Sequence, residues 1–147
     1  MSGESVRELL VIEDSPEDFE ATRRTLVKAG FDNPIVHLPD GDQALEYLFG
    51  SRPRRARKPN PGLILLDLNL PGTDGRQVLS RVKADPQLRQ VPVVVMTTSR
   101  DNRDVRECYR AGANSYIQKP LDLTGFQRAL RTLRDYWFDV VVLPPGD

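Results

Sequence analysis

The chain has 147 residues, which is enough for one domain with a buried core and short for two. Lysine plus arginine equals aspartate plus glutamate at 21 each, so no overall field attracts nucleic acid or an anionic membrane. The single cysteine, Cys108, excludes an internal disulfide framework and fits a reducing compartment. No signal-peptide segment is visible, and no run reaches the ~20 apolar residues of a transmembrane helix. We therefore expect a cytoplasmic protein with no nucleic-acid or membrane partner.

Short apolar runs alternate with stretches of helical periodicity along the chain. The first run, residues 9–12, leads into a helix that Ser15 can cap, with Pro16 at its first position, Asp18 reaching back and Gly30 past its end. Further strands are predicted at residues 35–38, 63–66, 93–96 and 116–118. The helices between and after them begin near Asp40, Asp74, Asp101 and Asp122, and the last runs to Trp137.

This order is a βα unit repeated five times. The first, third and fourth strands are continuous aliphatic runs, as expected for strands buried on both faces. Because crossover connections are right-handed, the pattern predicts an α/β fold with a doubly wound, five-stranded parallel sheet. We expect a single domain over residues 1–147, with its core at about 7–137 and an apolar tail at 138–147.

The irregular stretch Ser51–Pro61 carries five basic residues among its prolines. Such a segment can be a nucleic-acid-binding arm or a solvated loop between a helix and a strand. No aromatic residue is interleaved with its charges, which favours the loop.

Polar side chains stand where four of the strands end. Glu13 and Asp14 follow the first strand, Asp67 the third, Thr97 the fourth and Lys119 the fifth. Each alone is more often a turn or capping residue than a functional one. Because the carboxyl ends of parallel strands meet at one edge of such a sheet, their joint occurrence predicts a shared pocket.

Three carboxylates in one pocket repel each other by roughly 3 kcal/mol per pair at ~5 Å and an effective dielectric of ~20. A Mg²⁺ ion with oxygen ligands would relieve this repulsion. An ammonium beside the acids indicates an anionic ligand, and the hydroxyl of Thr97 can donate to a ligand oxygen. The set suits a phosphoryl group that is attacked in line by a carboxylate oxygen, and Asp67 is the best nucleophile.

With these residues in place, the chain resembles the receiver domains of two-component response regulators, over roughly residues 7–137. The steps of 30 residues from Asp67 to Thr97 and 22 from Thr97 to Lys119 fit that family, as does the loop sequence Leu70–Gly75. The longer step from Asp14 to Asp67 contains the Ser51–Pro61 insertion. The resemblance implies a flavodoxin-like sheet with strand order 2-1-3-4-5.

The resemblance also assigns roles. Asp67 would accept a phosphoryl group from a histidine kinase, with Mg²⁺ held by Glu13, Asp14, Asp67 and the backbone carbonyl of Asn69. Thr97 and Lys119 would bind the phosphoryl oxygens, and Tyr116 would be the aromatic switch residue. The protein would catalyse only its own phosphotransfer and dephosphorylation. The Lys119–Pro120 bond would be cis.

The C-terminal segment Tyr136–Leu143 is almost entirely apolar, so it must be covered. It can fold back on its own domain or pack on a second copy in a symmetric dimer that also uses the face of the fourth and fifth helices. We expect no effector domain after it. The ending and the basic insertion resemble single-domain regulators paired with phytochrome-type histidine kinases.

Two rival interpretations remain. A Mg²⁺-dependent phosphatase of the haloacid-dehalogenase type also uses an aspartate after a strand, but it needs a second acid where this chain has Asn69. The other rival is a receiver-like binding module that works without phosphorylation, although every pocket position is filled here.

Overall fold

The structure, a computed structural model, describes residues 7–50 and 60–144. The predicted order of elements is confirmed: β1 (Leu9–Ile12), α1 (Pro16–Lys28), β2 (Ile35–Leu38), α2 (Gly41–Phe49), β3 (Leu63–Leu66), α3 (Gly75–Ala84), β4 (Val93–Thr97), α4 (Asn102–Ala111), β5 (Ser115–Gln118) and α5 (Leu123–Arg134). A 3-10 turn, η2 (Leu88–Gln90), precedes β4, and a π-helical turn, η3 (Asp135–Val140), follows α5. Most of the basic stretch, residues 51–59, lies outside the described residues.

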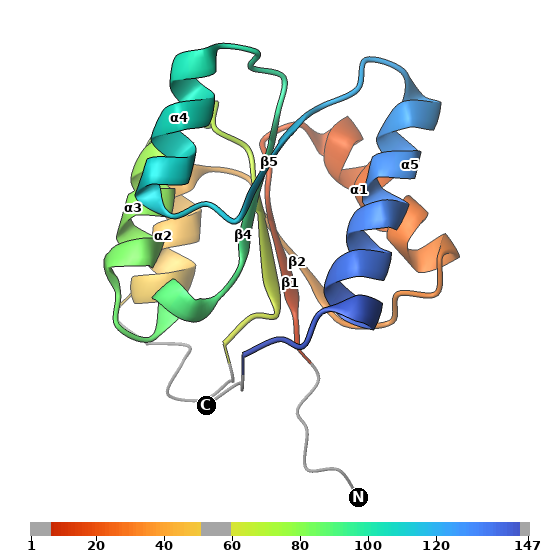
Figure 1. The fold of residues 1–147 in the computed structure, drawn as a ribbon, viewed down its shortest axis with the longest axis horizontal. Helices are drawn as coiled ribbons and strands as arrows, with labels where there is room; N and C mark the ends of the chain where they lie inside the picture. Colours follow the sequence, from red (N-terminus) through yellow and green to blue (C-terminus); the bar gives the residue numbers. More distant parts are fainter. Residues whose placement is uncertain (1–6, 51–59, 145–147) are drawn as a thin grey trace, which may run out of the picture.

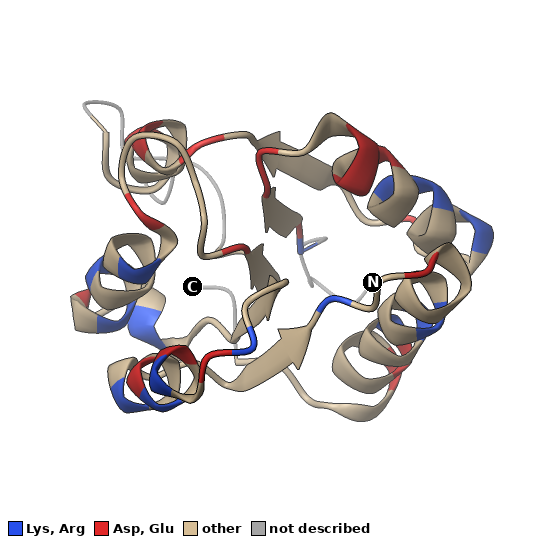
Figure 2. Cartoon of the chain, turned by 90° about the horizontal axis from the view of Figure 1, so that it is seen from above, with Lys and Arg blue, Asp and Glu red and all other residues tan. Residues whose placement is uncertain are grey.

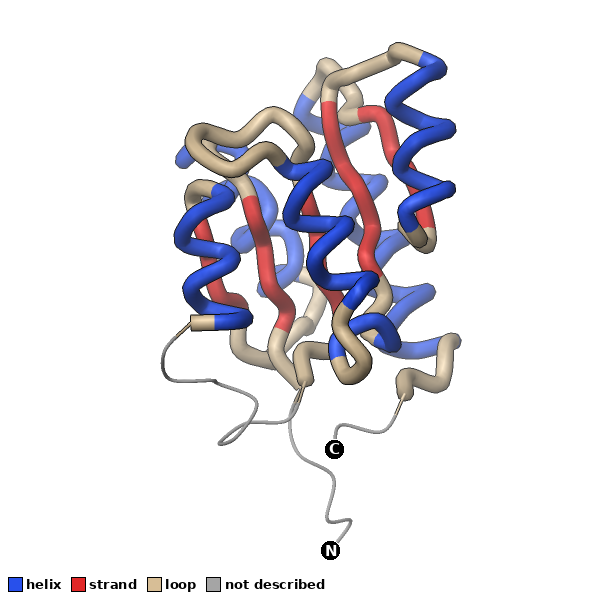
Figure 3. Tube along the Cα trace, turned by 90° about the vertical axis from the view of Figure 1, so that its left-hand side faces the viewer, coloured by secondary structure: helices blue, strands red, loops and turns tan. Residues whose placement is uncertain are grey.

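The five strands form one parallel sheet in the order β2-β1-β3-β4-β5, which confirms the doubly wound, flavodoxin-like α/β fold. Helices α1 and α5 cover one face, and α2, α3 and α4 cover the other (Figure 1). Seen from the side, the strands run next to one another with helices in front and behind (Figure 3). The topology places β3 in the middle of the sheet, between β1, which leads into Glu13 and Asp14, and β4, which ends at Thr97.

Alternate residues of each central strand supply the two cores. Leu10, Ile12 and Ile64 face the α2–α4 side, whereas Leu9, Val11 and Leu63 face the α1–α5 side. All of these side chains are buried. This two-sided burial explains why β1, β3 and β4 are uninterrupted aliphatic runs in the sequence.

A polar residue caps the start of each α-helix, as the sequence predicts. Ser15 accepts a hydrogen bond from the Asp18 amide at 3.2 Å. Asp40, Asp74, Asp101 and Asp122 accept equivalent bonds for α2 to α5. Each capping residue is the last residue of the loop between a strand and the next helix, so these caps fix where those loops end.

The apolar tail folds back on its own domain. Phe138 packs edge-on against Phe31 with ring centroids 4.8 Å apart, and Trp137 packs on the same core. Farther along, the Pro144 carbonyl accepts a hydrogen bond from Arg7 at 2.7 Å. The fold-back alternative is therefore the observed one for these residues, although Val140 and Val142 remain exposed.

Charges of both signs are interspersed around the described helices (Figure 2). Among the described helices, none combines the length and apolar character that crossing a bilayer requires.

Candidate functional site

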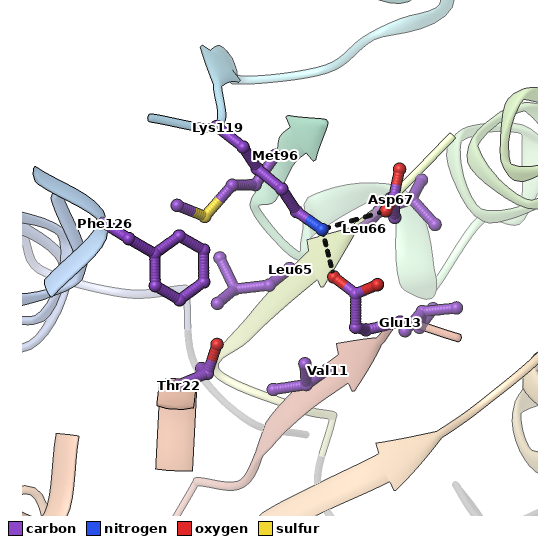
Figure 4. Close-up of a pocket in the computed structure, with 10 residues that line it drawn as sticks. Val11, Glu13, Thr22, Leu65, Leu66, Asp67, Met96, Lys119 and Phe126 are labelled. Carbon is purple, nitrogen blue, oxygen red and sulfur yellow. Dashed lines mark hydrogen bonds and ion pairs between the residues drawn. The ribbon is translucent and has the colours of Figure 1, made fainter. Parts of the chain in front are cut away.

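The predicted site residues from β1, β3 and β5 meet at the carboxyl edge of the sheet. The Lys119 ammonium lies 2.5 Å from Glu13 Oε1 and 3.1 Å from Asp67 Oδ2, although 106 and 52 residues separate the partners in the chain. Figure 4 shows the lysine reaching between the two carboxylates. The convergence predicted from the strand ends is thus present in the structure.

The aliphatic stem of Lys119 passes an apolar wall before the ammonium reaches the acids. Met96, Leu65 and Phe126 line the same pocket (Figure 4). Only 5% of Lys119 is exposed, so solvent contributes little to satisfying its charge. Burial in such a pocket works against the ammonium, but hydrogen bonds with Asp18 and Glu13 outweigh it, and the pKa of Lys119 is raised.

Glu13, Asp14 and Asp67 each offer a carboxylate oxygen, and these oxygens lie within 4.8 Å of one another. Glu13 and Asp67 are buried, whereas Asp14 is exposed. Burial, followed by the charge of Asp67, raises the pKa of Glu13 to about 7, against the opposing effect of Lys119. The three carboxylates carry more negative charge than the single ammonium can neutralise. Their hard oxygen atoms are ligands that suit a divalent cation such as Mg²⁺.

The backbone around Asp67 is closely packed. Oδ1 of Asp67 accepts a hydrogen bond from the Asn69 amide at 3.3 Å. At Gly75, the first residue of α3, a Cβ atom would collide with the backbone of Asp67 and Leu68, so glycine is required there. The proposed metal contact of the Asn69 carbonyl stays a prediction.

Thr97 is fully buried, and its hydroxyl has no hydrogen-bond partner within residues 7–50 and 60–144. Its carbonyl accepts a hydrogen bond from the Lys119 amide at 2.7 Å, which joins the ends of β4 and β5. An unpaired buried hydroxyl is costly unless a ligand or water completes it. Thr97 is therefore suited to donate to an oxygen that arrives with a ligand.

Tyr116 lies on β5, half-buried against the α2–α4 side of the core. Its hydroxyl donates to the Ser99 carbonyl at 3.1 Å, and burial raises its pKa. Ser99 belongs to the loop that leaves β4 directly after Thr97. Tyr116 is thus linked to the Thr97 loop through a single hydrogen bond.

A charged network that sequence reasoning missed extends from this loop to α3. The Ser99 hydroxyl donates to Asp104 at 2.6 Å, and Arg76 binds Asp104 at 2.7 Å and Asp74 at 2.9 Å. The side chain of Asp104 is only 17% exposed. Arg76 therefore joins α3 to α4, and Asp104 joins α4 to the loop that follows Thr97.

The sequence also assigns Asp18 the wrong partner. It predicts that Asp18 reaches back to its own helix start, but the carboxylate binds Lys119 at 2.8 Å instead. The Ser15 hydroxyl accepts its hydrogen bond from the backbone amide of Asp18, so the Asp18 carboxylate is free to bind Lys119. The available signal was its place in the first turn after β1, which points it toward the same sheet edge.

One backbone expectation is wrong. The described chain contains no cis peptide bond, so Lys119–Pro120 is trans. Trans is the ordinary state of an X–Pro bond, and here Lys119 still reaches both Thr97 and the acids.

Comparison with known proteins identifies the class. The response regulator receiver domain model matches residues 9–131, and the chain belongs to that family. This assignment overturns the phosphatase alternative. Members of this family act in two-component signalling.

Particular relatives are similar over almost their full length. Response regulator Rcp1 of Synechocystis sp. is 36% identical over 136 residues, 92% of each chain. The structure of its Mn²⁺-bound form superimposes with a TM-score of 0.86 over 94% of this chain and 99% of that one. The phosphorylated cyanobacterial phytochrome response regulator RcpA gives a TM-score of 0.88 at 33% identity, covering 95% and 99%.

Proposed function

We propose that this protein is a phosphoacceptor switch that receives a phosphoryl group on Asp67 from a phytochrome-type histidine kinase. The observation that carries the proposal is the buried Lys119 ammonium bound to Asp67 and Glu13 beside a cluster of three carboxylates. The names of the relatives support it, because one is a phosphorylated phytochrome response regulator and another binds Mn²⁺.

The chemistry follows from the donor atoms. An Asp67 oxygen forms a bond to phosphorus as the P–N bond of the donor phosphohistidine breaks and the imidazole leaves with the bond electrons. Lys119 and the Thr97 hydroxyl then bind phosphoryl oxygens. Mg²⁺ held by Glu13, Asp14, Asp67 and the Asn69 carbonyl would neutralise the negative charge of the transferred phosphoryl group. Water attack on the acyl phosphate returns Asp67 to a carboxylate, so the protein turns over no separate substrate.

The signal leaves through the loop after β4. Thr97 moves toward the phosphoryl group, and Ser99 and Tyr116 follow because the tyrosine hydroxyl is bonded to the Ser99 carbonyl. This changes the face made by α4, β5 and α5. We propose that a second copy binds this face and the adjoining exposed tail residues Tyr136, Val140 and Val142, forming a homodimer in the cytoplasm.

Radiolabelling with a phosphorylated kinase tests the proposal. The wild-type chain should gain an acid-stable, alkali-labile label that requires Mg²⁺ and is abolished in Asp67→Asn. Asp32→Asn, which removes an exposed carboxylate from the α1–β2 loop, should label like the wild type. Retained label on Asp67→Asn would refute the assignment of the acceptor.

The rival, a binding module that works without phosphorylation, predicts a different result. It predicts no label on the wild-type chain from any phytochrome-type kinase, in either light state. Wild-type labelling that depends on Mg²⁺ excludes it.

A further inference from the structure

The Lys119 ammonium has no donor left for a new ligand. A lysine ammonium carries three N–H donors. Three carboxylates lie within 3.1 Å of its nitrogen: Glu13 at 2.5 Å, Asp18 at 2.8 Å and Asp67 at 3.1 Å. A phosphoryl oxygen on Asp67 can be bound by Lys119 only if one of these contacts is given up.

The three partners differ in how easily they can be released. The side chains of Glu13 and Asp67 are 8% and 10% exposed, so losing the ammonium would leave a charge in a dry pocket. The Asp18 side chain is 41% exposed and can turn into water. Its backbone amide is held by Ser15, so α1 keeps its start when the side chain moves.

We propose that Asp18 is a positioning residue that occupies Lys119 in the resting state and exchanges places with the incoming phosphoryl group. The exchange transfers one N–H donor of Lys119 from an Asp18 oxygen to a phosphoryl oxygen, and Asp18 becomes hydrated. No covalent bond changes in this step. The inference rests on the proposed function, because it presupposes that Asp67 takes the group.

Two effects of Asp18 act in the same direction. The carboxylate competes directly for the ammonium, and its negative charge repels the phosphoryl group that approaches the same nitrogen. Removing the charge should therefore tighten the binding of a phosphoryl group. A merely structural role for the contact would instead leave phosphoryl affinity unchanged or weaken it.

The test measures the affinity for beryllofluoride, a noncovalent phosphoryl mimic, in Mg²⁺ by fluorine NMR. Asp18→Asn keeps the side-chain shape and should bind roughly three- to tenfold tighter than the wild type. Asp18→Ser, which removes the acceptor arm but keeps a residue suited to a helix start, should bind tighter as well. Thermal unfolding of each variant verifies that it is folded.

Glu17→Gln is the matched control. It removes the same charge from the adjacent, exposed residue of α1, whose carboxylate accepts a hydrogen bond from the Ser15 hydroxyl and is not one of the three carboxylates bound to Lys119. Its affinity should change by less than about twofold because water and salt screen an exposed charge. Equal or weaker binding by folded Asp18→Asn, or an equal gain in Glu17→Gln, would overturn the inference. Failure of the wild-type chain to bind beryllofluoride in Mg²⁺ would refute the proposed function itself, and this inference with it.

Discussion

The buried Glu13 carboxyl makes the stability of the metal-free protein fall as pH rises. Its pKa is about 7 in the folded chain and 4.5 for an ordinary glutamate. Because the folded state holds the proton more tightly, this group stabilises the fold fully below pH 4.5. The contribution is lost as pH rises toward 7, where the folded carboxyl also ionises.

Glu13→Gln removes the ionisation while keeping the shape and an oxygen that can still accept from Lys119. The pKa difference corresponds to roughly 3 kcal/mol of unfolding free energy. Since Lys119 and Asp67 are coupled to the same proton, the measured gain should be about 1–3 kcal/mol at pH 8. It should shrink to a few tenths near pH 5, where both forms are neutral in the fold.

Urea unfolding in the presence of a chelator, at pH 5 and pH 8, measures this difference. Glu17→Gln serves as the control for loss of one carboxylate and should change the free energy of unfolding little at either pH. Added Mg²⁺ should reduce this gain, because the wild-type chain binds the cation with Glu13 as well as Asp14 and Asp67, whereas the variant keeps only the other two carboxylates. A Glu13→Gln protein no more stable than the wild type at pH 8 without metal would refute the reasoning.

Three further predictions concern the network and the tail. In urea unfolding, Arg76→Ala should lower the free energy of unfolding by about 1–2 kcal/mol, because it leaves the largely buried Asp104 without its cation. The control Arg23→Ala breaks an exposed ion pair within α1 and should lower it by less than about 0.5 kcal/mol. Phe138→Ala should cost about 1–3 kcal/mol by opening space beside Phe31, and calorimetry that finds no change would contradict the observed tail packing. In sedimentation at micromolar concentration the full chain should be a dimer and a chain truncated after Asp135 should shift toward monomer; a truncated dimer would move the interface to α4 and α5.

Features that depend on short-range physics were predictable from the sequence. The capping residues, the aliphatic strands and the polar strand ends each follow from local geometry, and a parallel sheet then fixes where they meet. Thus Glu13, Asp67 and Lys119 could be brought together across most of the chain from pattern alone. The spacing of Asp67, Thr97 and Lys119 then indicated the receiver-domain family.

The sequence did not predict which partner a side chain binds where two partners are equally acceptable. Asp18 is an acceptable first-turn residue whether it binds its own helix or Lys119, and only the packing of α1 against the sheet edge decides. The partners of Arg76 lie on its own helix cap and on α4, a choice that the sequence does not encode. The tail has β-branched residues typical of a strand, but residues 135–140 form a helical turn in which Trp137 and Phe138 pack against the core and Phe138 contacts Phe31.

The sharing of one ammonium among several carboxylates has a consequence for selectivity. Without a cation, the resting pocket carries more negative than positive charge, and the only described cation in it is already bound on three sides. Free inorganic phosphate and nucleotides, which abound in a cell, therefore meet a repulsive site. We expect that only a donor docked with its phosphoryl group in line, and a divalent ion beside it, overcomes this barrier, so that ambient anions do not trigger the switch.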